Sequence, residues 1–329
     1  MTGVGKILYV PPRGIGDLVF SLPLLHSLHD AMPLADIEIP IPDRVSVKQM
    51  IDLIGFVKPC GVFLPKPSED PLADERWVAA KAGDSKKRYA AEKKIFEKYL
   101  SGSYDLAVVA KPFKIDSIQA TQVSRNELRA MGFDWKKAHM VDGFSAFATY
   151  LGIPSSNSFN LVFDRSTDVK LSDGSIPRVG SRYVIFNLGA SDSAKKWGCE
   201  KYAKVSEWLN NQGVNSVLVG TPDEYQDSQV IARDGKGIVN LVSSNGYSLD
   251  LRNYAVLASR ASVAVSGDTG LLHIADAVGT KVVGLYGTTS PDKTGPYNNR
   301  QNVVSRYNSD KDLSKITEAE VIKTLEGLL

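Results

Sequence analysis

The sequence predicts an α/β protein made of two doubly wound units, each with a parallel β-sheet. Short β-branched runs alternate with longer segments of helical period, and this alternation occurs separately in each half of the chain. The chain also has 329 residues, which exceeds the size at which a single hydrophobic core is usual. We therefore expect two domains, each binding its ligand beyond the carboxyl ends of its strands.

The first half contains three expected strands and one expected helix. The strands are KILYV, ADIEIPI and YDLAVVA, at residues 6–10, 35–41 and 104–110, and the helix covers about residues 17–31. A strand, a helix and a second strand in this order are typical of a parallel sheet with helical crossovers.

The segment from Pro65 to Leu100 interrupts the alternation. It contains the charged run DSKKRYAAEKKIFEKYL, residues 84–100, which has helical spacing but little apolar content. We interpret this run as a helix exposed to solvent. A basic patch that faces an acceptor or a membrane surface is the alternative interpretation.

The second half repeats the alternation with four expected strands, YVIFNLG, SVLVG, ASVAVSG and KVVGLYG. Helices are expected near residues 200–212, from about residue 222 and from about residue 270. At the end of the chain, Thr317 and Glu320 have the spacing of a capping box ahead of an amphipathic helix.

A polar segment, FDRSTDVKLSDGSIPRVGSR, separates the two halves and is rich in Ser, Asp, Gly and Pro. This composition is typical of a linker. We place the domain boundary near residue 172, which gives domains of residues 1–172 and 173–329.

Composition excludes several classes of protein. The hydrophobic and charged fractions, 43% and 23%, are those of a globular protein. The formal charge of +2, from 39 basic and 37 acidic residues, is too small to indicate a nucleic-acid partner. The two cysteines, Cys60 and Cys199, have no metal-ligand spacing and are expected to be reduced thiols in the cytoplasm.

No membrane-spanning or signal segment is expected. The N-terminal apolar run ILYV is short and is followed by two prolines, unlike a signal peptide. The longest uncharged stretch, residues 143–163, is broken by Pro154 and is rich in Ser and Asn.

A glycine-containing turn that opens a helix follows the first expected strand. Gly14 and Gly16 allow close approach of a ligand to the backbone, and Asp17 lies in the first helical turn. The dinucleotide fingerprint G-x-G-x-x-G is incomplete, because its third position is Val19. From this motif alone, a catalytic carboxylate and a simple helix cap are equally good interpretations of Asp17.

Two further motifs follow strand ends in the second half. NLGASDSAKKWG carries Lys195 and Lys196, whose ammonium groups are suited to pairing with phosphate, although paired lysines are also common on surfaces. SGDTGLLHIADAVG places the turn Gly267–Gly270 at the start of a helix, where backbone amides bind phosphate. In this motif Asp268 and Thr269 are also good helix caps, and a packed core residue is the alternative for His273.

Together these motifs resemble glycosyltransferase family 9, the ADP-heptose:lipopolysaccharide heptosyltransferase family. The resemblance rests on ILYVPPRGIGDLVFSLPLLHSLHDAMP, HMVDGFSAFATYLGIP, NLGASDSAKKWGCEKYAKVSEWL, SVLVGTPDE and LASRASVAVSGDTGLLHIADAVGTKVVGLYGTTSPDKTGPY. It implies a GT-B fold, in which two Rossmann-like domains face a cleft, with the acceptor on the first domain and the donor on the second. Residues 65–100 and the sequence AVVAKPFKID depart from the family pattern.

The resemblance also implies roles for single residues. Asp17 matches the family's aspartate that deprotonates the acceptor hydroxyl, and Arg13, Gly14 and Gly16 form its acceptor-side loop. Lys195 matches the lysine that contacts the donor diphosphate.

The remaining matches lie on the donor side. The family's D-T-G-x-x-H element, which holds the diphosphate and the transferred sugar, corresponds to Asp268, Thr269, Gly270 and His273, preceded by Gly267. The acidic position after SVLVG, where the family contacts the ribose, is either Asp223 or Glu224.

The expected activity is therefore transfer of a sugar from a nucleotide-diphosphate sugar to a hydroxyl of a glycan or glycolipid, with inversion at the anomeric carbon. By resemblance the donor is ADP-heptose and the pathway is lipopolysaccharide core assembly, with a cytoplasmic location and peripheral contact with the inner membrane. No cofactor or metal is expected, because helix amides and a lysine cover the leaving group, and the Asp310–Asp312 pair is interpreted as surface. The alternatives are a family 9 enzyme that uses another donor sugar and a small soluble glycoside or other glycan, and an inactive protein that binds a sugar nucleotide.

Overall fold

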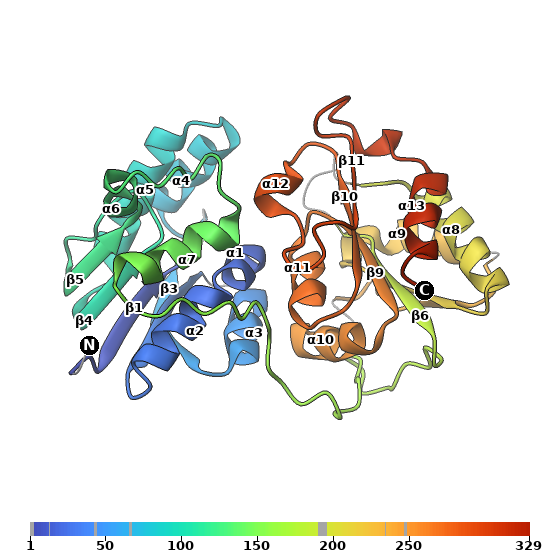
Figure 1. Ribbon diagram of the computed structural model, residues 1–329, viewed down its shortest axis with the longest axis horizontal. Helices are drawn as coiled ribbons and strands as arrows, with labels where there is room; N and C mark the ends of the chain where they lie inside the picture. The colour runs from blue at the N-terminus through green and yellow to red at the C-terminus, as the bar shows by residue number, and fades with distance from the viewer. Residues whose placement is uncertain are drawn as a thin grey trace. The chain divides into compact units, whose positions relative to one another are not determined.

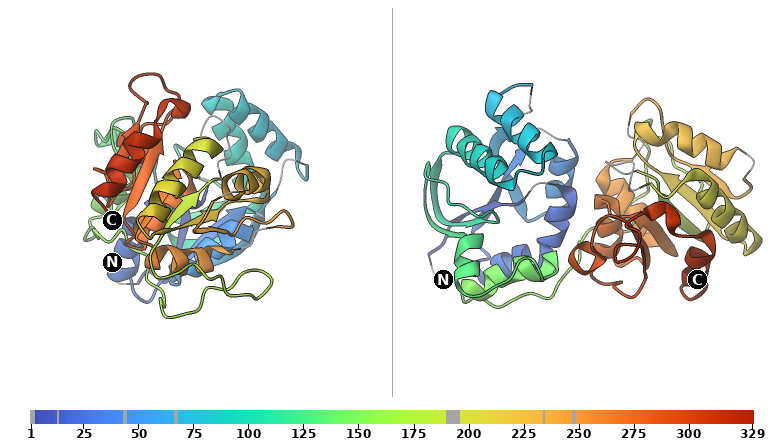
Figure 2. Two further views of the ribbon diagram at one scale, coloured as in Figure 1. Left: turned by 90° about the vertical axis from the view of Figure 1, so that its right-hand side faces the viewer. Right: turned by 90° about the horizontal axis from the view of Figure 1, so that it is seen from above.

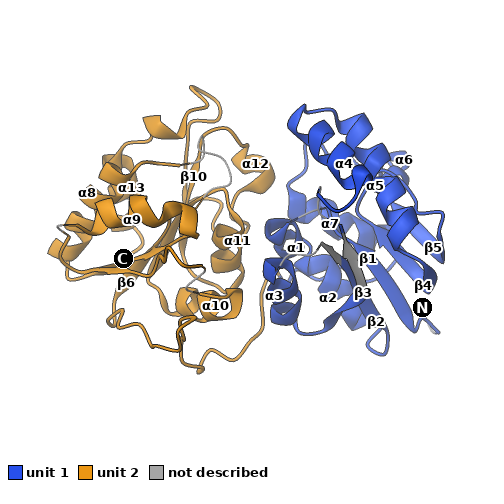
Figure 3. Cartoon of the chain, turned by 180° about the vertical axis from the view of Figure 1, so that it is seen from behind, with its two compact units in different colours: residues 1–158 blue, residues 159–329 orange. Residues whose placement is uncertain are grey.

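The chain forms two compact units, residues 1–158 and 159–329 (Figures 1 and 3). The structure is a computed structural model that describes residues 3–12, 14–42, 45–65, 68–189, 196–233, 235–246 and 249–329. Each unit contains its own sheet and its own core, so each is described separately below.

Unit 1 contains a five-stranded sheet with the order β3-β2-β1-β4-β5, in which all neighbouring strands are parallel. This is the strand order of a Rossmann fold. Expected strands at residues 6–10, 35–41 and 104–110 are confirmed as β1, β2 and β4. The bounds are β1 Lys6–Val10, β2 Asp36–Pro42, β3 Val57–Leu64, β4 Gly102–Val109 and β5 Ile118–Ser124.

Helices cover both faces of this sheet (Figures 1 and 2). Helices α4 and α5 lie on one face, and α2, α3 and α7 lie on the other. Four apolar residues of β1, from Ile7 to Val10, are fully buried, as expected for a parallel strand covered on both faces. The helices are α1 Ile15–Phe20, α2 Leu22–Ala31, α3 Val45–Ile54, α4 Pro71–Lys81, α5 Ser85–Tyr99, α6 Arg125–Ala130 and α7 Met140–Tyr150.

The helix expected over residues 17–31 is instead two helices, α1 and α2, which meet at Ser21. Pro23 has no backbone N–H, so one continuous helix would lose a hydrogen bond at this position. The Ser21 hydroxyl donates to the carbonyl oxygen of Asp17 at 2.6 Å and so stabilises the end of α1. The break leaves Asp17 on a short helix of its own.

The charged run at residues 84–100 forms a helix, α5, as expected, but the helix is not wholly exposed to solvent. It buries a stripe made of Ala91, Glu92, Ile95 and Phe96. These positions lie on one helical face, and α5 packs against α4 and β3. The interpretation as a solvated helix is therefore wrong for this face.

Unit 2 contains a six-stranded parallel sheet with the order β11-β10-β9-β6-β7-β8. Counted within the unit, this is again the Rossmann order. All four strands expected here are confirmed, as β6, β7, β9 and β10. The bounds are β6 Tyr183–Asn187, β7 Asn215–Val219, β8 Ile238–Asn240, β9 Val263–Gly267, β10 Val282–Tyr286 and β11 Val303–Ser305.

Helices α8, α9 and α13 cover one face of this sheet, and α10 and α11 cover the other (Figure 1). The largest core side chain is Trp197, which is 2% exposed and whose Nε1 donates to the carbonyl oxygen of Ile316 at 2.9 Å. The capping box of Thr317 and Glu320 is confirmed at the start of α13. The helices are α8 Cys199–Asn211, α9 Tyr225–Ala232, α10 Leu251–Arg260, α11 Gly270–Ala277, α12 Pro291–Thr294 and α13 Glu318–Glu326, with 3-10 turns at Pro222–Glu224 and Leu313–Lys315.

The boundary between the units follows Ser158, whereas the sequence places it near residue 172. The segment after Ser158 is irregular but is attached to α10 and α11. The amide of Leu161 donates to the carbonyl oxygen of Ala277 at 3.0 Å, and the amide of Lys170 donates to Asn253 Oδ1 at 2.8 Å. These hydrogen bonds make residues 159–171 part of unit 2.

Candidate active site

In each sheet, the sequence motifs lie at the position where the strand order reverses. In unit 1 the chain runs outward from β1 to β3 and then returns to the other side of β1 with β4, so the strand order reverses between β1 and β4. In unit 2 it reverses between β6 and β9. Ligands of open α/β sheets bind beyond the carboxyl ends of the strands at such reversals. Asp17 follows β1, and the turn Gly267–Gly270 follows β9.

Asp17 lies at the third position of α1, close to the start of the helix. The amide of Gly14 donates to Asp17 Oδ2 at 3.1 Å, so Asp17 caps its own helix. A Cβ atom built on Gly14 would meet no other described atom within 4 Å, which leaves open space beside this carboxylate. The capping interpretation is thus confirmed as a contact, and the carboxylate lies on the helix that follows the carboxyl end of β1.

A basic side chain lies close to Asp17. Arg125, at the start of α6, lies with its guanidinium 4.1 Å from the ring centre of Trp135. Burial lowers the pKa of Arg125, and the negative charges of Tyr89 (when ionised) and Asp17 oppose this. Asp17 and Arg125 are therefore near enough to interact electrostatically.

The end of β4 contributes a buried ion pair to the same edge of the sheet. Lys111 is 3% exposed, and its Nζ lies 3.1 Å from Glu92 Oε2 of α5 and also donates to the carbonyl oxygen of Pro12. The other oxygen of Glu92 lies 3.8 Å from Arg76 Nη1 of α4. One carboxylate thus faces two cations, which leaves one net positive charge in this triad of Arg76, Glu92 and Lys111.

In unit 2, the N-terminus of α11 is arranged to bind an anion. Thr269 occupies the N-cap position but makes no side-chain hydrogen bond to the helix; its hydroxyl lies 3.1 Å from Ser266 Oγ. The first-turn amides of α11 therefore have no side-chain cap among the described residues. Such amides, together with the helix dipole, favour a phosphate group.

Asp268 and His273 form one hydrogen-bonded network beside this helix start. His273 Nε2 lies 3.3 Å from Asp268 Oδ1, and the hydroxyl of Thr294 donates to Asp268 Oδ2 at 3.3 Å. Tyr286 donates to the carbonyl oxygen of Thr294 at 2.6 Å, and burial and the charge of Asp268 raise the pKa of this tyrosine. His273 is 2% exposed, so the packed-histidine interpretation is correct for its burial, and the contact with Asp268 ties it to the motif.

Asp276 anchors the other end of α11. It is fully buried, accepts from Asn299 Nδ2 at 2.6 Å and from the amide of Asn298 at 3.0 Å, and burial raises its pKa. These bonds attach the helix to the loop between α12 and β11. Because both ends of α11 are held, its N-terminal amides are fixed in direction.

The two acidic residues after β7 differ in their surroundings. Glu224 is 2% exposed and accepts from the amide and the hydroxyl of Thr221 at 3.0 Å and 2.6 Å, so it caps its own turn. Its other oxygen lies 3.3 Å from Lys196 Nζ, which also lies 3.2 Å from Asp227. Asp223 is exposed. Of the two, Asp223 is the one whose side chain is open to solvent.

Two of the predicted site residues, Arg13 and Lys195, lie outside the described residues. In the part of the chain that the structure describes, no cluster of three or more His, Cys, Asp or Glu side chains is placed to hold a metal ion. The Asp310–Asp312 pair is part of a turn, in which Asp312 accepts from the amide of Ser314 at 2.9 Å. No helix within the described ranges has the length and apolarity needed to cross a bilayer.

A sequence model of glycosyltransferase family 9 (heptosyltransferase) matches residues 106–322, which is more than half of the chain. This chain belongs to glycosyltransferase family 9. The match contains the motifs NLGASDSAKKWG and SGDTGLLHIADAVG of this family 9 enzyme, whereas Asp17 precedes the matched range.

Curated relatives of the family 9 enzyme include two proteins of Haemophilus influenzae. Lipooligosaccharide heptosyltransferase 2 is 24% identical over 349 aligned residues, which cover 98% of this chain and 92% of the relative. Lipopolysaccharide core heptosyltransferase OpsX is 29% identical over 180 residues, covering 54% of this chain. The match spans about half of OpsX, 51% of its length.

Solved structures similar to this enzyme share its fold. A family 9 glycosyltransferase from Veillonella parvula has a TM-score of 0.71 and 19% identity, covering 98% of this chain and 97% of that one. The Escherichia coli heptosyltransferase WaaC, solved with ADP, has a TM-score of 0.69 and 20% identity, covering 98% of this chain and 100% of that one. The family 9 enzyme thus has the GT-B fold, with two Rossmann-like units, as the sequence predicts.

Several candidate site residues of the family 9 enzyme are missed by sequence reasoning. Lys111 follows a buried strand at its carboxyl end, and this position is a signal that could have found it. Glu92 carries no such signal, because it lies in the middle of a helix. Arg125 directly follows the carboxyl end of β5, but that strand is not predicted from the sequence. Asp276 belongs to the motif SGDTGLLHIADAVG, but only the structure shows that its carboxylate is buried and anchors α11.

Proposed function

We propose that this family 9 enzyme transfers heptose from ADP-heptose to a hydroxyl group of an acceptor in lipopolysaccharide core assembly, with Asp17 as the general base. The observation that carries the proposal is the placement of Asp17 and of the Asp268–Gly270 turn, each at the strand-order reversal of its own sheet. The names of the relatives support the choice of sugar, and a WaaC structure solved with ADP-2-deoxy-2-fluoro heptose supports the choice of nucleotide.

In the proposed reaction the acceptor oxygen attacks the anomeric carbon while Asp17 accepts the proton of the hydroxyl. A new bond from carbon to the acceptor oxygen forms as the bond from carbon to the diphosphate oxygen breaks, so the configuration inverts. The first-turn amides of α11 and the ammonium group of Lys195 neutralise the charge that develops on the departing ADP. No metal ion takes part in this proposal.

The remaining predicted residues have supporting roles. Asp268 and His273 hold each other in place beside the diphosphate, and Asp276 fixes the direction of α11. Asp223 is proposed to contact the ribose, since Glu224 is engaged with Thr221 and Lys196. A lipid-linked acceptor would bring the enzyme to the cytoplasmic surface of the inner membrane as a peripheral protein.

The test is a transfer assay with purified enzyme and ADP-heptose, with and without EDTA. Acceptors are lipopolysaccharide isolated from a strain that lacks core heptose and, in parallel, small soluble glycosides. Release of ADP together with a heptosylated product identified by mass spectrometry is expected with the lipopolysaccharide, with or without the chelator. Transfer only to the soluble glycosides, or only from another nucleotide sugar, would favour the alternative donor and acceptor instead.

A further inference from the structure

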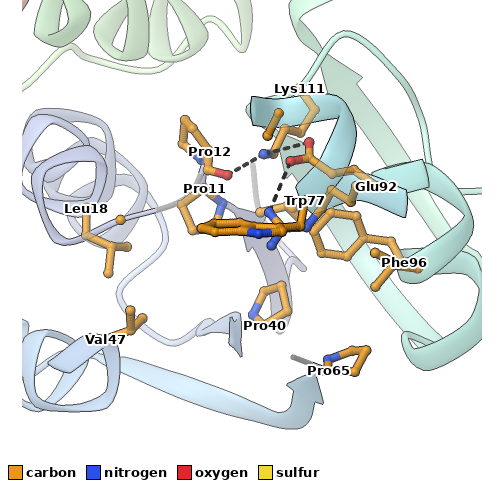
Figure 4. A pocket seen from close by; sticks show the side chains of 15 residues that line it. Pro11, Pro12, Leu18, Pro40, Val47, Pro65, Trp77, Glu92, Phe96 and Lys111 are labelled. Carbon is orange, nitrogen blue, oxygen red and sulfur yellow. Dashed lines mark hydrogen bonds and ion pairs between the residues drawn. The ribbon is translucent and has the colours of Figure 1, made fainter. Parts of the chain in front are cut away.

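Unit 1 contains a pocket of about 270 Å³ at the carboxyl ends of its strands (Figure 4). One wall is formed by the loop after β1 and by α1 and α3, and the opposite wall is formed by α4 and α5. These two helices come from residues 65–100, the segment that departs from the family pattern. The segment that departs from the family pattern therefore lines a cavity and does not lie on a distant surface.

The first wall brings the pocket next to Asp17. Gly14 and Leu18 both line it, and they flank Asp17 in the first turn of α1. The carboxylate oxygen Oδ2 of Asp17 lies 3.1 Å from the amide nitrogen of Gly14. A molecule that fills the pocket would thus lie beside the carboxylate proposed as the base.

The opposite wall carries a large aromatic side chain that is only partly covered. Trp77 of α4 lines the pocket and is 42% exposed, although its indole is a large, mostly apolar side chain of the kind that packs in protein cores. Figure 4 shows the indole nearly edge-on, pointing toward the side of the pocket that Leu18 and Val47 form. An indole is flat and apolar on its faces, so it suits a ligand with a flat apolar face.

The wall formed by α4 and α5, together with the residue Lys111 after β4, also carries charged groups. Arg76, Glu92 and Lys111 all line the pocket, and they form the triad described above. Charged groups of this kind hydrogen bond to hydroxyl groups, and specificity in mostly apolar pockets comes from a few such polar groups. An alkyl chain would leave these groups without a ligand partner, whereas a sugar would use them.

We propose that this pocket is the acceptor subsite and holds the pyranose ring that bears the accepting hydroxyl. The C–H face of the ring lies on Trp77, and its hydroxyl groups face the triad and Asp17. A pyranose fits this chemistry because its axial C–H bonds form an apolar face while its edges carry hydroxyls. The helices α4 and α5 therefore set acceptor specificity. This proposal rests on the proposed function in one respect: it takes the molecule that binds in the pocket to be the acceptor.

The main test compares Trp77→Ala with Trp77→Phe and with Val78→Ala. Val78 is the neighbouring residue on α4, is 57% exposed and does not line the pocket. Trp77→Ala is expected to raise the KM for the acceptor about 5- to 30-fold, with the KM for ADP-heptose unchanged, because only the stacking surface is lost. Trp77→Phe should restore most of the acceptor affinity, and Val78→Ala should behave as wild type. An acceptor KM for Trp77→Ala equal to that of Val78→Ala would overturn the proposal.

A second pair of variants tests the volume of the pocket by adding side-chain atoms, whereas Trp77→Ala removes them. Ala80 lines the pocket, whereas Ala90 is exposed on α5. Ala80→Leu should raise the acceptor KM by narrowing the pocket, and Ala90→Leu should not. Equal acceptor KM values in these two variants would count against the pocket, even if Trp77→Ala were poorly folded.

A binding measurement without donor separates this proposal from the proposed function. Saturation-transfer NMR with methyl pyranosides as probes should show contact of the ring C–H face with wild-type enzyme and loss of this contact in Trp77→Ala. If wild-type enzyme binds the probes in this way but transfers no heptose, the proposed function fails and the subsite stands. If heptose is transferred but no probe or acceptor signal depends on Trp77, the subsite fails and the proposed function stands.

Discussion

The structure confirms the helix-cap interpretation of Asp17, and its role as the catalytic base stays a prediction. Asp17 caps α1 through the amide of Gly14, and it lies at the strand-order reversal where an acceptor would bind. Capping orients the carboxylate at the helix start, so one contact serves both structure and the proposed chemistry. A substitution that keeps the cap and removes the base can separate the two roles.

Asp17→Asn is expected to retain folding and lose turnover. The side-chain oxygen of Asn can still accept from the amide of Gly14, but Asn cannot accept the acceptor proton, so kcat should fall about 10²- to 10⁴-fold. The measurement is kcat together with the melting temperature and the affinity for ADP, both of which should stay close to wild type. A folded Asp17→Asn enzyme with normal kcat would show that another residue is the base.

Lys195→Ala is expected to weaken ADP binding by about 10- to 100-fold, because a charge-assisted contact contributes about 1.5 to 3 kcal/mol. Lys196→Ala is the matched control, since the ammonium group of Lys196 already faces Glu224 and Asp227. Titration calorimetry with ADP should show a large loss of affinity only for Lys195→Ala. Equal losses in both variants would show that general positive charge, rather than Lys195, binds the diphosphate.

At the residue scale, the sequence locates the motifs but does not show which of two adjacent residues in a motif is buried and which is exposed. It leaves Asp223 and Glu224 as alternatives, because both follow the same strand end. The spacing of Thr221 and Glu224 is that of a capping box, which is a signal that could have separated them. No sequence signal indicates that the carboxylate of Asp268 would lie against Thr294, because Thr294 belongs to a different element, α12.

At the scale of single elements, the sequence predicts the buried strands better than the helices that pack on them. The central strands consist of β-branched runs buried on both faces, which are easily recognised, whereas the sequence does not predict the edge strands β3, β5, β8 and β11. The buried face of α5 was missed because Glu92 lies within it. A buried glutamate looks like a solvent-facing residue in the sequence, and only its pairing with Lys111 explains its burial.

Asp70 joins the start of α4 to the end of α5, and its contribution to stability should depend on pH. It accepts from the amide of Leu72 at 2.7 Å, from Lys98 Nζ at 2.5 Å and from the hydroxyl of Tyr99 at 2.5 Å. Lys98, followed by Tyr99, lowers the pKa of Asp70 from 3.8 to about 2. Because the pKa is lower in the folded protein, the stabilising effect is fully present above pH 3.8 and disappears as the pH falls toward 2.

The measurement is the difference in melting temperature between wild type and Asp70→Asn across this pH range. Asn keeps the cap of α4 but lacks the charge that pairs with Lys98, so wild type should melt at a higher temperature near neutral pH. This difference should shrink as the carboxyl group becomes protonated. A difference that stays constant down to pH 2 would assign the effect to packing rather than to the charge of Asp70.

At the scale of the whole molecule, the parallel direction of the strands and the division into two units follow from the alternation of strands and helices, whereas the position of the boundary between the units does not. The polar segment whose composition indicates a linker, residues 163–182, overlaps the segment 159–171, which contains no helix or strand. Its hydrogen bonds to α10 and α11 assign it to unit 2, and composition carries no information about which core a loop contacts.

ADP should stabilise unit 2 and leave unit 1 unchanged, because both anion-binding motifs lie in unit 2. At a ligand concentration of about 100 times Kd, the stabilisation is about 2.7 kcal/mol. Hydrogen-exchange mass spectrometry with ADP should therefore show slower exchange in residues 159–329, above all near the start of α11, with little change in residues 1–158. Protection confined to residues 1–158 would contradict the assignment of the nucleotide to unit 2.

The helices α4 and α5 have one further consequence, which concerns how new acceptors could be acquired during evolution. They follow one another in the chain between β3 and β4, pack mainly on each other, and are joined at their outer ends through Asp70 and Lys98. One contiguous gene segment therefore encodes a complete wall of the pocket. Recombination could replace that segment in a single event and leave Asp17 and the whole of unit 2 as they are. With the roles proposed above for the pocket and for unit 2, an ancestral enzyme could change its acceptor without rebuilding its donor site.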